Sequence, residues 1–428
     1  MNSLRIRGAG KVSGQIEISG NKNAALPMIA AACLSDEPVL LHNVPDILDM
    51  RNMLQLANYL GVETLFEDGS LQLCAKNINR SSVPKEFCDK IRTSFLFAGR
   101  LTARCGEAEL FQPGGDVIGK RRLDSHFYGL KKLGMELDLE HGSYKFKREK
   151  KMQGSEIFFD EASVTATEHI MMTAALAEGI TIIRNAACEP HVTQLAQLLN
   201  RMGAKIEGLD TNLLRIEGVK KLHGAEFWLE GDHVEAASYL SLCAACGGDL
   251  EITGKITPHN YWMLRRVFER FGLQFTLKSD YIRMQRLGEM RVRPDFGNVI
   301  PVIADGPWPQ FPSDMMSCMI TVATQAEGTV LFFEKMFESR IYFVDKLIAM
   351  GANAVVCDPH RVLISGPAQL HGSVIPSPDI RAGMALIIAA CCAQGESLVK
   401  NADMVFRGYS KLLPKLQGIG CDIALCED

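Results

Sequence analysis

Residues 53–66, MLQLANYLGVETLF, lead from an amphipathic helix directly into a strand through Gly61. Met53, Ala57 and Leu60 follow the three-to-four spacing of an apolar helix face. A glycine directly after the last apolar position is typical of a helix that ends in the left-handed conformation. The residues that follow are β-rich and predict a strand.

The same helix–glycine–strand pattern occurs six times along the chain, about once in every 70 residues. Its glycines are Gly61, Gly134, Gly203, Gly272, Gly351 and Gly420. A regular period of this kind indicates a repeated structural unit, and it outweighs any single local pattern.

A second helix precedes each amphipathic helix. It is rich in small residues and apolar nearly all round, which predicts that it is buried. These segments are 23–43, 91–111, 166–185, 235–253, 314–333 and 381–401. We expect an α/β protein of two domains with three units each, with the buried helices inside and the sheets outside. A continuous solenoid is the alternative, but the terminal units show none of the polar capping that a solenoid needs.

Length and composition bound the class of protein. With 428 residues the chain is too long for one hydrophobic core and predicts two or three domains. A net charge of −4 and 47% hydrophobic residues give no indication of nucleic acid or a membrane surface as a partner. The first residues lack the apolar core of a signal peptide, and no apolar run reaches about 18 residues. We expect a cytoplasmic protein.

The cysteines and histidines do not predict a metal site. The 13 cysteines are scattered through apolar segments, so we expect them to be reduced and mostly buried. Cys243 and Cys246 have the spacing of a redox or metal pair, but nothing completes a site, and we interpret them as core residues. The histidines show no metal-ligand spacing either, so we expect no metal.

Three of the six buried helices carry a cation at their start, namely Lys22, Arg92 and Arg381. Cations are unfavourable at the positive end of a helix dipole, so ordinary capping does not explain them. Together with free backbone N–H groups they favour the binding of an anion. Further bases lie just before or inside the outer helices, at Lys120, Arg121, Arg340 and Arg407. We expect arginine side chains to recognise phosphate and carboxylate groups there.

The remaining helix starts carry residues that commonly act as N-caps. They include Asn21, Asn23, Thr165, Asp232, Asp314 and Asp379. Asp314, in FPSDM, is the acid that we expect to take part in proton chemistry, and a plain N-cap is the alternative.

Residues 113–122, PGGDVIGKRR, combine two glycines, an acid and three bases. A solvated surface loop is the simplest interpretation. Among helix starts that are rich in charge, the same stretch predicts a mobile lid in which Gly114 and Gly115 allow movement and Asp116 delivers a proton.

Five motifs together resemble the enolpyruvyl transferase family over essentially the whole chain. They are ISGNKNAALP, PGGDVIGKR, FPSDMM, SPDIRAG and FRGY. The resemblance implies two inside-out α/β domains of three repeats each, with the active site in the cleft between them. It places residues 22–231, including the mobile 112–122 loop, in one domain, and residues 1–21 with 232–428 in the other.

The resemblance also implies a reaction. The enolpyruvyl group of phosphoenolpyruvate is transferred to the 3-hydroxyl of UDP-N-acetylglucosamine with release of phosphate, which is the first committed step of peptidoglycan synthesis. No metal or organic cofactor takes part. Phosphoenolpyruvate and the nucleotide sugar would then be the only partners implied, with no nucleic acid and no membrane.

Roles for single residues follow from the same resemblance. Lys22 and Asn23 match positions that meet phosphoenolpyruvate and the sugar, and Asp314 matches the proposed general base. The bases that match the phosphate site are Arg121 and Arg407, and those near the carboxylate are Arg340 and Arg381. The nucleotide-sugar positions are Arg92, Arg121, Arg122, Leu123, Asp124, Ser125, Ser163, Val164 and Met336, with Asn23 and Asp314 shared.

Three positions depart from the family pattern. Asp116 replaces the usual loop cysteine, whose thiolate the antibiotic fosfomycin alkylates, so we expect insensitivity to that drug. Arg122 replaces a proline and Thr165 replaces a glycine near the nucleotide, which leaves transfer to another acceptor, such as UMP, open. A non-catalytic binding protein with this fold is a further alternative, but it would be expected to lose Lys22, Asp314 or Arg407.

Overall fold

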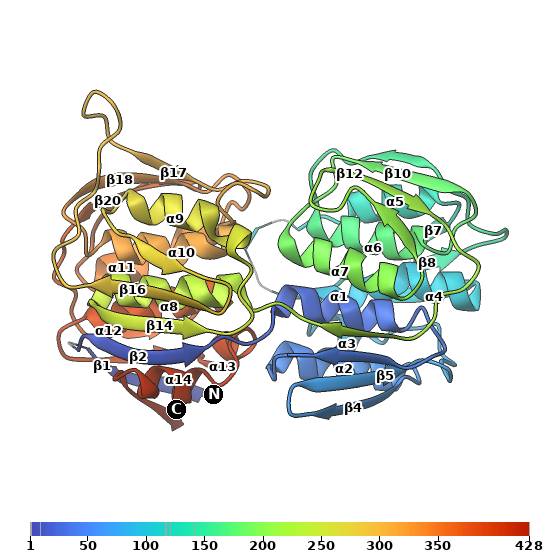
Figure 1. Ribbon diagram of the computed structural model, residues 1–428, viewed down its shortest axis with the longest axis horizontal. Helices are drawn as coiled ribbons and strands as arrows, with labels where there is room; N and C mark the ends of the chain where they lie inside the picture. The colour runs from blue at the N-terminus through green and yellow to red at the C-terminus, as the bar shows by residue number, and fades with distance from the viewer. Residues whose placement is uncertain (1, 9, 116–117, 120, 141, 428) are drawn as a thin grey trace. The chain divides into compact units, whose positions relative to one another are not determined.

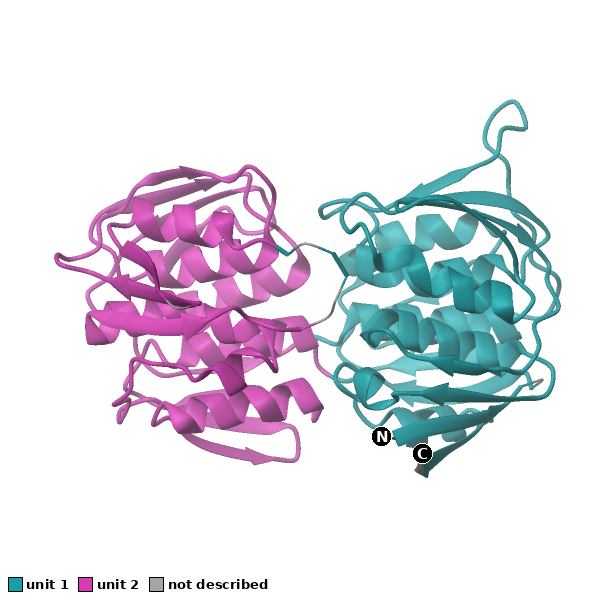
Figure 2. Ribbon diagram, turned by 180° about the vertical axis from the view of Figure 1, so that it is seen from behind, with its two compact units in different colours: residues 1–19, 116–121, 230–428 teal, residues 20–115, 122–229 magenta. Residues whose placement is uncertain are grey.

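The computed structural model describes residues 2–8, 10–115, 118–119, 121–140 and 142–427. The chain divides into two compact units (Figure 2). Unit 1 comprises residues 1–19, 116–121 and 230–428, and unit 2 comprises residues 20–115 and 122–229. The main crossings between the units, at residues 19/20 and 229/230, lie two residues before the domain boundaries that we expected.

Unit 1 contains three four-stranded sheets. The first has the order β15 (Phe275–Leu277), β16 (Tyr281–Arg286), β14 (Gly248–Thr253), β2 (Val12–Glu17). The second has the order β17 (Val302–Ala304), β18 (Gly328–Phe333), β20 (Arg361–Gly366), β19 (Asn353–Asp358). The third has the order β21 (Val374–Pro376), β22 (Glu396–Lys400), β1 (Asn2–Arg7), β23 (Asp422–Glu427). Each sheet holds one parallel pair, namely β14 with β2, β17 with β18, and β21 with β22.

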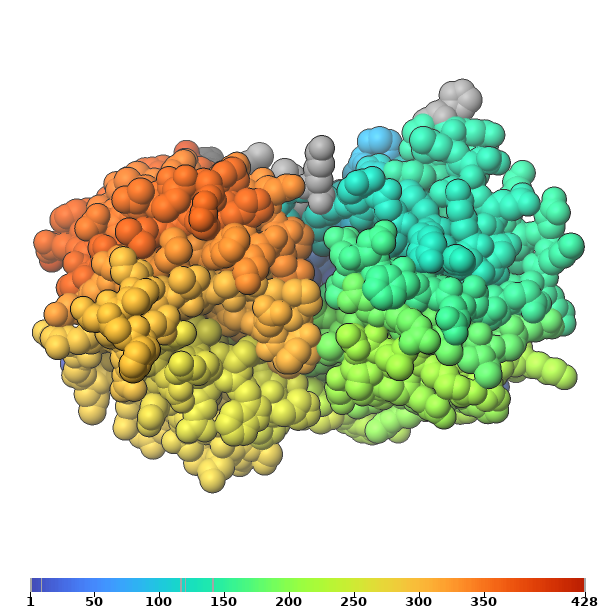
Figure 3. Space-filling view, turned by 90° about the horizontal axis from the view of Figure 1, so that it is seen from above, coloured from blue at the N-terminus to red at the C-terminus, as the bar shows by residue number. Residues whose placement is uncertain are grey.

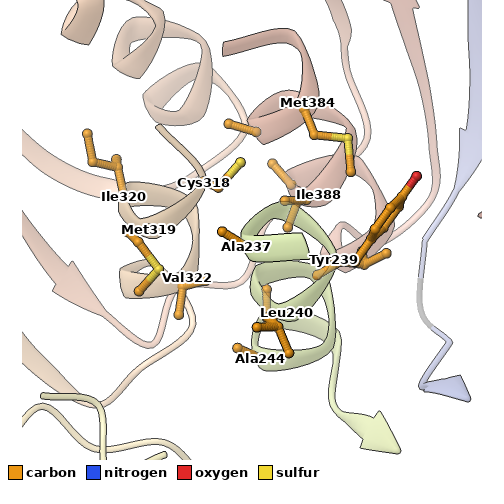
Figure 4. Packing of buried hydrophobic residues seen from close by; sticks show 14 of the residues in the cluster. Ala237, Tyr239, Leu240, Ala244, Cys318, Met319, Ile320, Val322, Met384 and Ile388 are labelled. Atoms are coloured by element: carbon orange, nitrogen blue, oxygen red, sulfur yellow. The ribbon is translucent and has the colours of Figure 1, made fainter. Parts of the chain in front are cut away.

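Three nearly fully buried helices form the centre of unit 1 (Figures 1 and 4). They are α8 (His233–Cys246), α10 (Ser313–Ala323) and α12 (Ile380–Cys392). At its start α10 contacts α12 through Asp314 and Arg381, and further along the hydroxyl of Thr321 donates to the carbonyl oxygen of Ala385 at 3.3 Å. The two helices therefore run parallel, and their first turns meet at one end of the unit.

Shorter helices cover the outside of unit 1. They are η2 (Pro258–Tyr261), α9 (Trp262–Glu269), η3 (Arg340–Phe343), α11 (Val344–Ala349), α13 (Asp403–Phe406) and α14 (Leu412–Gly418).

Unit 2 repeats this plan. Its sheets have the orders β13 (Ala225–Trp228), β3 (Val39–His42), β5 (Ser70–Cys74), β4 (Glu63–Glu67); β6 (Glu107–Phe111), β8 (Ser143–Lys147), β7 (Glu136–Glu140); and β11 (Lys205–Glu207), β12 (Leu213–Glu217), β10 (Ile180–Arg184), β9 (Glu156–Phe158). The inner helices are α1 (Lys22–Ala32), α4 (Phe97–Cys105) and α6 (Val164–Ala174). The outer helices are α2 (Leu48–Tyr59), α5 (Asp124–Lys132) and α7 (Pro190–Arg201), with the short α3 (Lys85–Cys88) before the second repeat.

All six repeat glycines adopt the left-handed backbone that the sequence predicts. Their φ angles are 96° at Gly61, 91° at Gly134, 98° at Gly203, 72° at Gly272, 106° at Gly351 and 94° at Gly420. The predicted α/β repeat is therefore confirmed at the point where each outer helix turns into a strand.

Two details of the helix starts differ from the expectation. The segment that contains Arg92 begins as a 3₁₀ helix, η1 (Arg92–Leu96), and α4 follows it. The cysteine at the far end of α4, Cys105, is exposed rather than buried. Asn21, Asp232 and Asp379 cap their helices with side-chain oxygens. Asp314 does not, because Pro312 is the N-cap of α10, so the plain N-cap interpretation of Asp314 is wrong.

The connection between β16 and β17 projects from unit 1 (Figure 1), and gold-coloured atoms of this part of the chain lie on the face that Figure 3 shows. It turns tightly between Asp295 and Val299, which form an isolated antiparallel bridge, and it leaves the ring of Phe296 fully exposed. Among the helices of the described residues, none combines the length and the apolar character that crossing a membrane requires.

Candidate active site

Asp314 is the second residue of α10 and is held by two arginines of unit 1. Its Oδ1 accepts a hydrogen bond from Nη2 of Arg340 at 3.0 Å, and its Oδ2 accepts from Nε and Nη2 of Arg381 at 3.3 and 3.2 Å. Both arginines are buried, whereas 30% of the Asp314 side chain is exposed. Charge-assisted hydrogen bonds therefore fix this carboxylate while one side of it stays accessible.

Arg340, the first residue of η3, has unused hydrogen-bonding capacity. Only 4% of the residue is exposed, and neither Nε nor Nη1 finds a hydrogen-bond partner among the described residues. Its guanidinium group lies 5.2 Å from the centre of the Phe337 ring. Because buried N–H groups without an acceptor are costly, this guanidinium is suited to bind an anion.

Arg381 is fixed by the first turn of α12. The carboxylate of Asp379 accepts the backbone N–H of Arg381 at 2.8 Å, and Nη1 of Arg381 donates to the hydroxyl of Tyr409 at 3.4 Å. That hydroxyl also lies 2.8 Å from the hydroxyl of Ser238 on α8. Burial acts to lower the pKa of Arg381, but Asp314, Tyr409 and Asp232 together outweigh it, and the pKa lies well above its usual value.

His233, the first residue of α8, belongs to the same region and was not predicted. The residue is buried, and its ring packs edge-on against Trp308 with 5.9 Å between the ring centres. Burial lowers the pKa of His233, although the charges of Asp232 and Asp314 oppose the change. A neutral imidazole therefore lies near the Asp314 cluster. Its position directly after the capping Asp232 was the only signal in the sequence.

Two buried carboxyl groups lie behind the first turn of α10. The hydroxyl of Ser313 lies 2.9 and 2.8 Å from the two oxygens of Glu334, and no N–H group of the described residues donates to Oδ2 of Asp305. Burial and a hydrogen bond to Asp305 raise the pKa of Glu334 to about 9. Glu334 is thus protonated at neutral pH and can donate to Asp305.

The other predicted residues of unit 1 are more exposed than Arg340 and Arg381. Met336 is 38% exposed on the segment between β18 and η3, Arg407 follows α13 and is half-buried, and Arg121 is also half-buried. The proposed proton donor Asp116 and the base Lys120 lie outside the described residues.

In unit 2, Lys22 begins α1 and is paired with an acid that the sequence did not indicate. Its Nζ lies 2.8 Å from Oδ2 of Asp49 on α2, and both side chains are nearly inaccessible to solvent. Asn21 caps the helix by accepting the N–H of Ala24 at 3.1 Å, and Asn23 is half-buried. Asp49 thus compensates the cation that is unfavourable at this helix start.

Arg92 and Arg122 meet at the start of α5. Nη2 of Arg92 donates to the carbonyl oxygen of Arg122 at 3.1 Å, and the exposed guanidinium of Arg122 forms two hydrogen bonds to Asp124, at 2.7 and 3.0 Å. Leu123 between them is buried, and Ser125 is half-buried. The arginine that departs from the family pattern therefore pairs with the acid two residues later.

Ser163 and Val164 lie at the start of α6, where Ser163 is the N-cap. Thr165 follows, and its hydroxyl contacts the buried ring of His126. A second buried ring, that of His169, lies next to His126. The sequence did not indicate this histidine pair, because the two residues are far apart along the chain and show no metal-ligand spacing.

No group of three or more His, Cys, Asp or Glu side chains in the described part of the chain is arranged to hold a metal ion.

Comparisons with known proteins agree over nearly the full length. The family model described as EPSP synthase (3-phosphoshikimate 1-carboxyvinyltransferase) matches residues 6–416. The chain is 50% identical to the UDP-N-acetylglucosamine 1-carboxyvinyltransferase of Treponema denticola, with 100% of both chains covered. It is 49% identical to the protein of the same name from Borreliella burgdorferi, with 99% of both chains covered.

Solved structures show the same fold. The enolpyruvyl transferase NikO from Streptomyces tendae matches with a TM-score of 0.88 at 22% identity, with 99% of both chains covered. An EPSP synthase from Acinetobacter baumannii matches with a TM-score of 0.77 at 16% identity over the full length of both chains. These matches confirm the predicted two-domain α/β fold.

Proposed function

Because the chain belongs to the EPSP synthase family of enolpyruvyl transferases, we propose that it transfers the enolpyruvyl group of phosphoenolpyruvate to the 3-hydroxyl of UDP-N-acetylglucosamine. Phosphate is released, and the product enters peptidoglycan synthesis. Identity close to 50% over the full length to proteins named for this reaction supports the acceptor as well as the donor.

The chemistry sets clear demands on the site. The sugar oxygen bonds to C2 of phosphoenolpyruvate, its proton must be removed, and a proton must reach C3. Phosphate then leaves from C2 while C3 gives up a proton, so that the C2–C3 double bond re-forms. The donor is a multiply charged anion, so fixed cations must hold it, and the two substrates must be held in reacting geometry.

The buried guanidinium of Arg340 is the observation on which the donor site rests. Two of its nitrogen atoms are buried without a partner among the described residues, although a third is bonded to Asp314. A carboxylate oxygen that accepts from either of those nitrogen atoms would leave the bond to Asp314 in place. We therefore assign Arg340, with Arg381, to the carboxylate of phosphoenolpyruvate.

The phosphate of the donor is assigned to Arg121 and Arg407, and Lys22 and Asn23 complete the set. Lys22 supplies a positive charge that Asp49 holds in place. Asp314, held by two arginines and still 30% exposed, is assigned as the base for the sugar hydroxyl. Asp116 is assigned as the proton donor.

The nucleotide sugar is assigned to two segments of unit 2 and to single residues elsewhere. The start of α5 contributes the N–H groups of its first turn and the charged side chains of Arg122 and Asp124. The start of α6 contributes backbone N–H groups that favour the binding of a diphosphate. The residues are Asn23, Arg92, Arg121, Arg122, Leu123, Asp124, Ser125, Ser163, Val164, Asp314 and Met336.

One assay tests the function directly. Phosphate release from phosphoenolpyruvate is measured with UDP-N-acetylglucosamine, UMP and shikimate 3-phosphate as separate acceptors. We expect turnover with UDP-N-acetylglucosamine and a kcat/KM at least about 100-fold lower with the other two. An acceptor that leaves polar groups of the site unpaired loses at least that much in kcat/KM. Preference for UMP or shikimate 3-phosphate would overturn the proposal.

Insensitivity to fosfomycin is a separate proposal that rests on Asp116. A carboxylate is a much poorer nucleophile toward the drug's epoxide than a thiolate. We expect no time-dependent inactivation, and Asp116→Cys should introduce it. Rapid inactivation of the unaltered protein would contradict this assignment.

The proposal also covers the domain division and the cellular compartment. Units 1 and 2 are taken as the two domains, and the reaction is placed in the cytoplasm. All 13 cysteines are free thiols, which suits a reducing compartment.

A further inference from the structure

His126 on α5 and His169 on α6 form a buried pair in unit 2. Their Nδ1 atoms are 3.0 Å apart, and both residues are almost completely inaccessible. The helices approach closely because Gly129 of α5 faces Ile170, where a Cβ atom on the glycine would come within 2.4 Å of the isoleucine side chain. The ring of Phe95 packs edge-on against both imidazoles.

The direction of each hydrogen bond in this pair is determined. The backbone N–H of Gly99 can only donate, and it lies 2.8 Å from Nε2 of His169, which must therefore accept. A neutral His169 then carries its proton on Nδ1 and donates to Nδ1 of His126. His126 in turn carries its proton on Nε2 and donates to the hydroxyl oxygen of Thr165 at 3.1 Å.

Both imidazole rings are neutral at physiological pH, as the chain of hydrogen bonds from Gly99 to Thr165 requires. Burial lowers the pKa of His169 to about 3. Burial also lowers the pKa of His126 far below its usual value, with added repulsion from His169 and Arg92.

In this arrangement the hydroxyl of Thr165 is available as a hydrogen-bond donor. Its oxygen already accepts from His126, and its own proton has no acceptor among the described residues. Other threonines of α6 behave differently, since Thr167 donates to the carbonyl oxygen of Ser163 and Thr173 donates to that of His169. Thr165 is also only half-buried, so a ligand can reach its hydroxyl.

The surroundings favour a negatively charged acceptor. Thr165 is the second residue of α6, where first-turn N–H groups and the helix dipole attract anions. Arg92 is close enough to His126 to affect its titration. A hydroxyl held with its proton outward in such a place is a donor for a phosphate oxygen.

We propose that Thr165 donates a hydrogen bond to a diphosphate oxygen of the nucleotide sugar, and that His126 and His169 are positioning residues that fix the direction of this bond. The inference rests on the proposed function, because the sugar nucleotide is its ligand. It gives Thr165, which stands where the family pattern has glycine, a role in recognising the acceptor.

Calorimetric titration of Thr165→Val and Thr165→Ser with UDP-N-acetylglucosamine, UDP and uridine tests the bond. Valine keeps the shape and removes the hydroxyl, so we expect the Kd for UDP and for UDP-N-acetylglucosamine to rise at least about 10-fold, as for a lost bond to a charged group. Serine should stay within about twofold of the unaltered protein. Uridine, which lacks phosphate, should bind all three proteins alike.

The outcomes separate the two proposals. If the unaltered protein binds both nucleotides and Thr165→Val binds them equally well, the inference fails and the proposed function stands. If the unaltered protein binds neither, the proposed function fails and the inference fails with it. A loss seen equally with uridine would assign the effect to the base or ribose, and it would overturn the diphosphate contact.

The role of the histidines has its own readouts. Nitrogen-15 spectra of the unliganded protein should show His169 protonated on Nδ1 and His126 on Nε2, and the opposite tautomers would overturn the relay. In steady-state kinetics, His126→Phe should raise the KM for UDP-N-acetylglucosamine as much as Thr165→Val does, with little change in kcat or in the KM for phosphoenolpyruvate. The double variant should add nothing further, and additive effects would contradict coupling.

Discussion

The guanidinium group of Arg340 shows how a single buried cation can be prepared for a ligand. One of its nitrogen atoms holds Asp314, and Nε and Nη1 have no acceptor among the described residues. A protein pays for such groups in stability unless a substrate completes them. The donor's carboxylate is the natural partner on the proposed assignment.

Arg340→Gln should therefore weaken the binding of phosphoenolpyruvate. We expect its KM to rise about 10- to 100-fold, since hydrogen bonds between charged groups contribute about 1.5–3 kcal/mol. Arg361→Gln is the matched control, because Arg361 is an exposed arginine that pairs with Asp358. Steady-state kinetics with varied phosphoenolpyruvate measure both, and an unchanged KM in Arg340→Gln would contradict the assignment.

Asp314→Asn tests the proposed base at the same scale. The amide keeps the size of the carboxylate but cannot take a proton, so we expect kcat to fall about 10²- to 10⁴-fold. Binding of UDP-N-acetylglucosamine, measured by calorimetry, should change far less. A kcat within threefold of the unaltered enzyme would rule out Asp314 as the base.

At the scale of elements, the first turn of α10 depends on the protonated carboxyl of Glu334. Burial raises its pKa in the folded protein to about 9, whereas the unfolded value is about 4.3. The folded state thus binds an extra proton between these values. The stability that this proton brings is complete below about pH 4 and is lost as the pH rises toward about 9.

Glu334→Gln removes this titration and keeps the shape of the protonated acid. We expect the free energy of unfolding of the variant, relative to the unaltered protein, to increase steadily between pH 6 and pH 9 in urea titrations. Glu289→Gln, at an exposed position, should show a constant difference. A constant difference for Glu334→Gln as well would mean that the carboxyl is ionised when folded.

The repeat glycines offer an equally local test. Gly134 has φ of 91° and open space around its missing Cβ, so Gly134→Ala adds backbone strain without a clash. We expect a loss of about 1–2 kcal/mol in the free energy of unfolding. Gly288→Ala is the control, since it also has open space but no positive φ. Equal effects of the two substitutions would contradict a requirement for the left-handed backbone.

The elements also show how far the sequence could lead. The glycine-ended helices and the buried helices were predictable, because backbone conformation and apolar spacing are local properties. The pairs Lys22–Asp49, His126–His169 and Asp305–Glu334 were not, because each joins residues from different elements. Only the packing of those elements brings them together. Their unfavourable helix positions marked Lys22, Arg92 and Arg381 as candidate site residues, but nothing in the sequence indicated the partners that hold them.

At the scale of the whole molecule, each unit has a hydrophobic cluster of its own. The cluster of unit 1 is centred on α8, α10 and α12, as Figure 4 shows, and a second cluster fills unit 2. Leu240 on α8 is completely buried in the first cluster, and Leu198 on α7 is completely buried in the second. The two residues are matched in type and burial, so they allow the cores to be weakened one at a time.

Leu240→Ala should weaken unit 1 selectively, and Leu198→Ala should weaken unit 2. A buried leucine cut to alanine costs about 2–5 kcal/mol, and hydrogen exchange reports the opening free energy of each region separately. In Leu240→Ala we expect amides of α10 and α12 to exchange faster while those of α1 and α6 keep their rates, and the reverse in Leu198→Ala. If either substitution accelerates exchange equally in both units, the two cores unfold as one cooperative system and the division into independent domains is wrong.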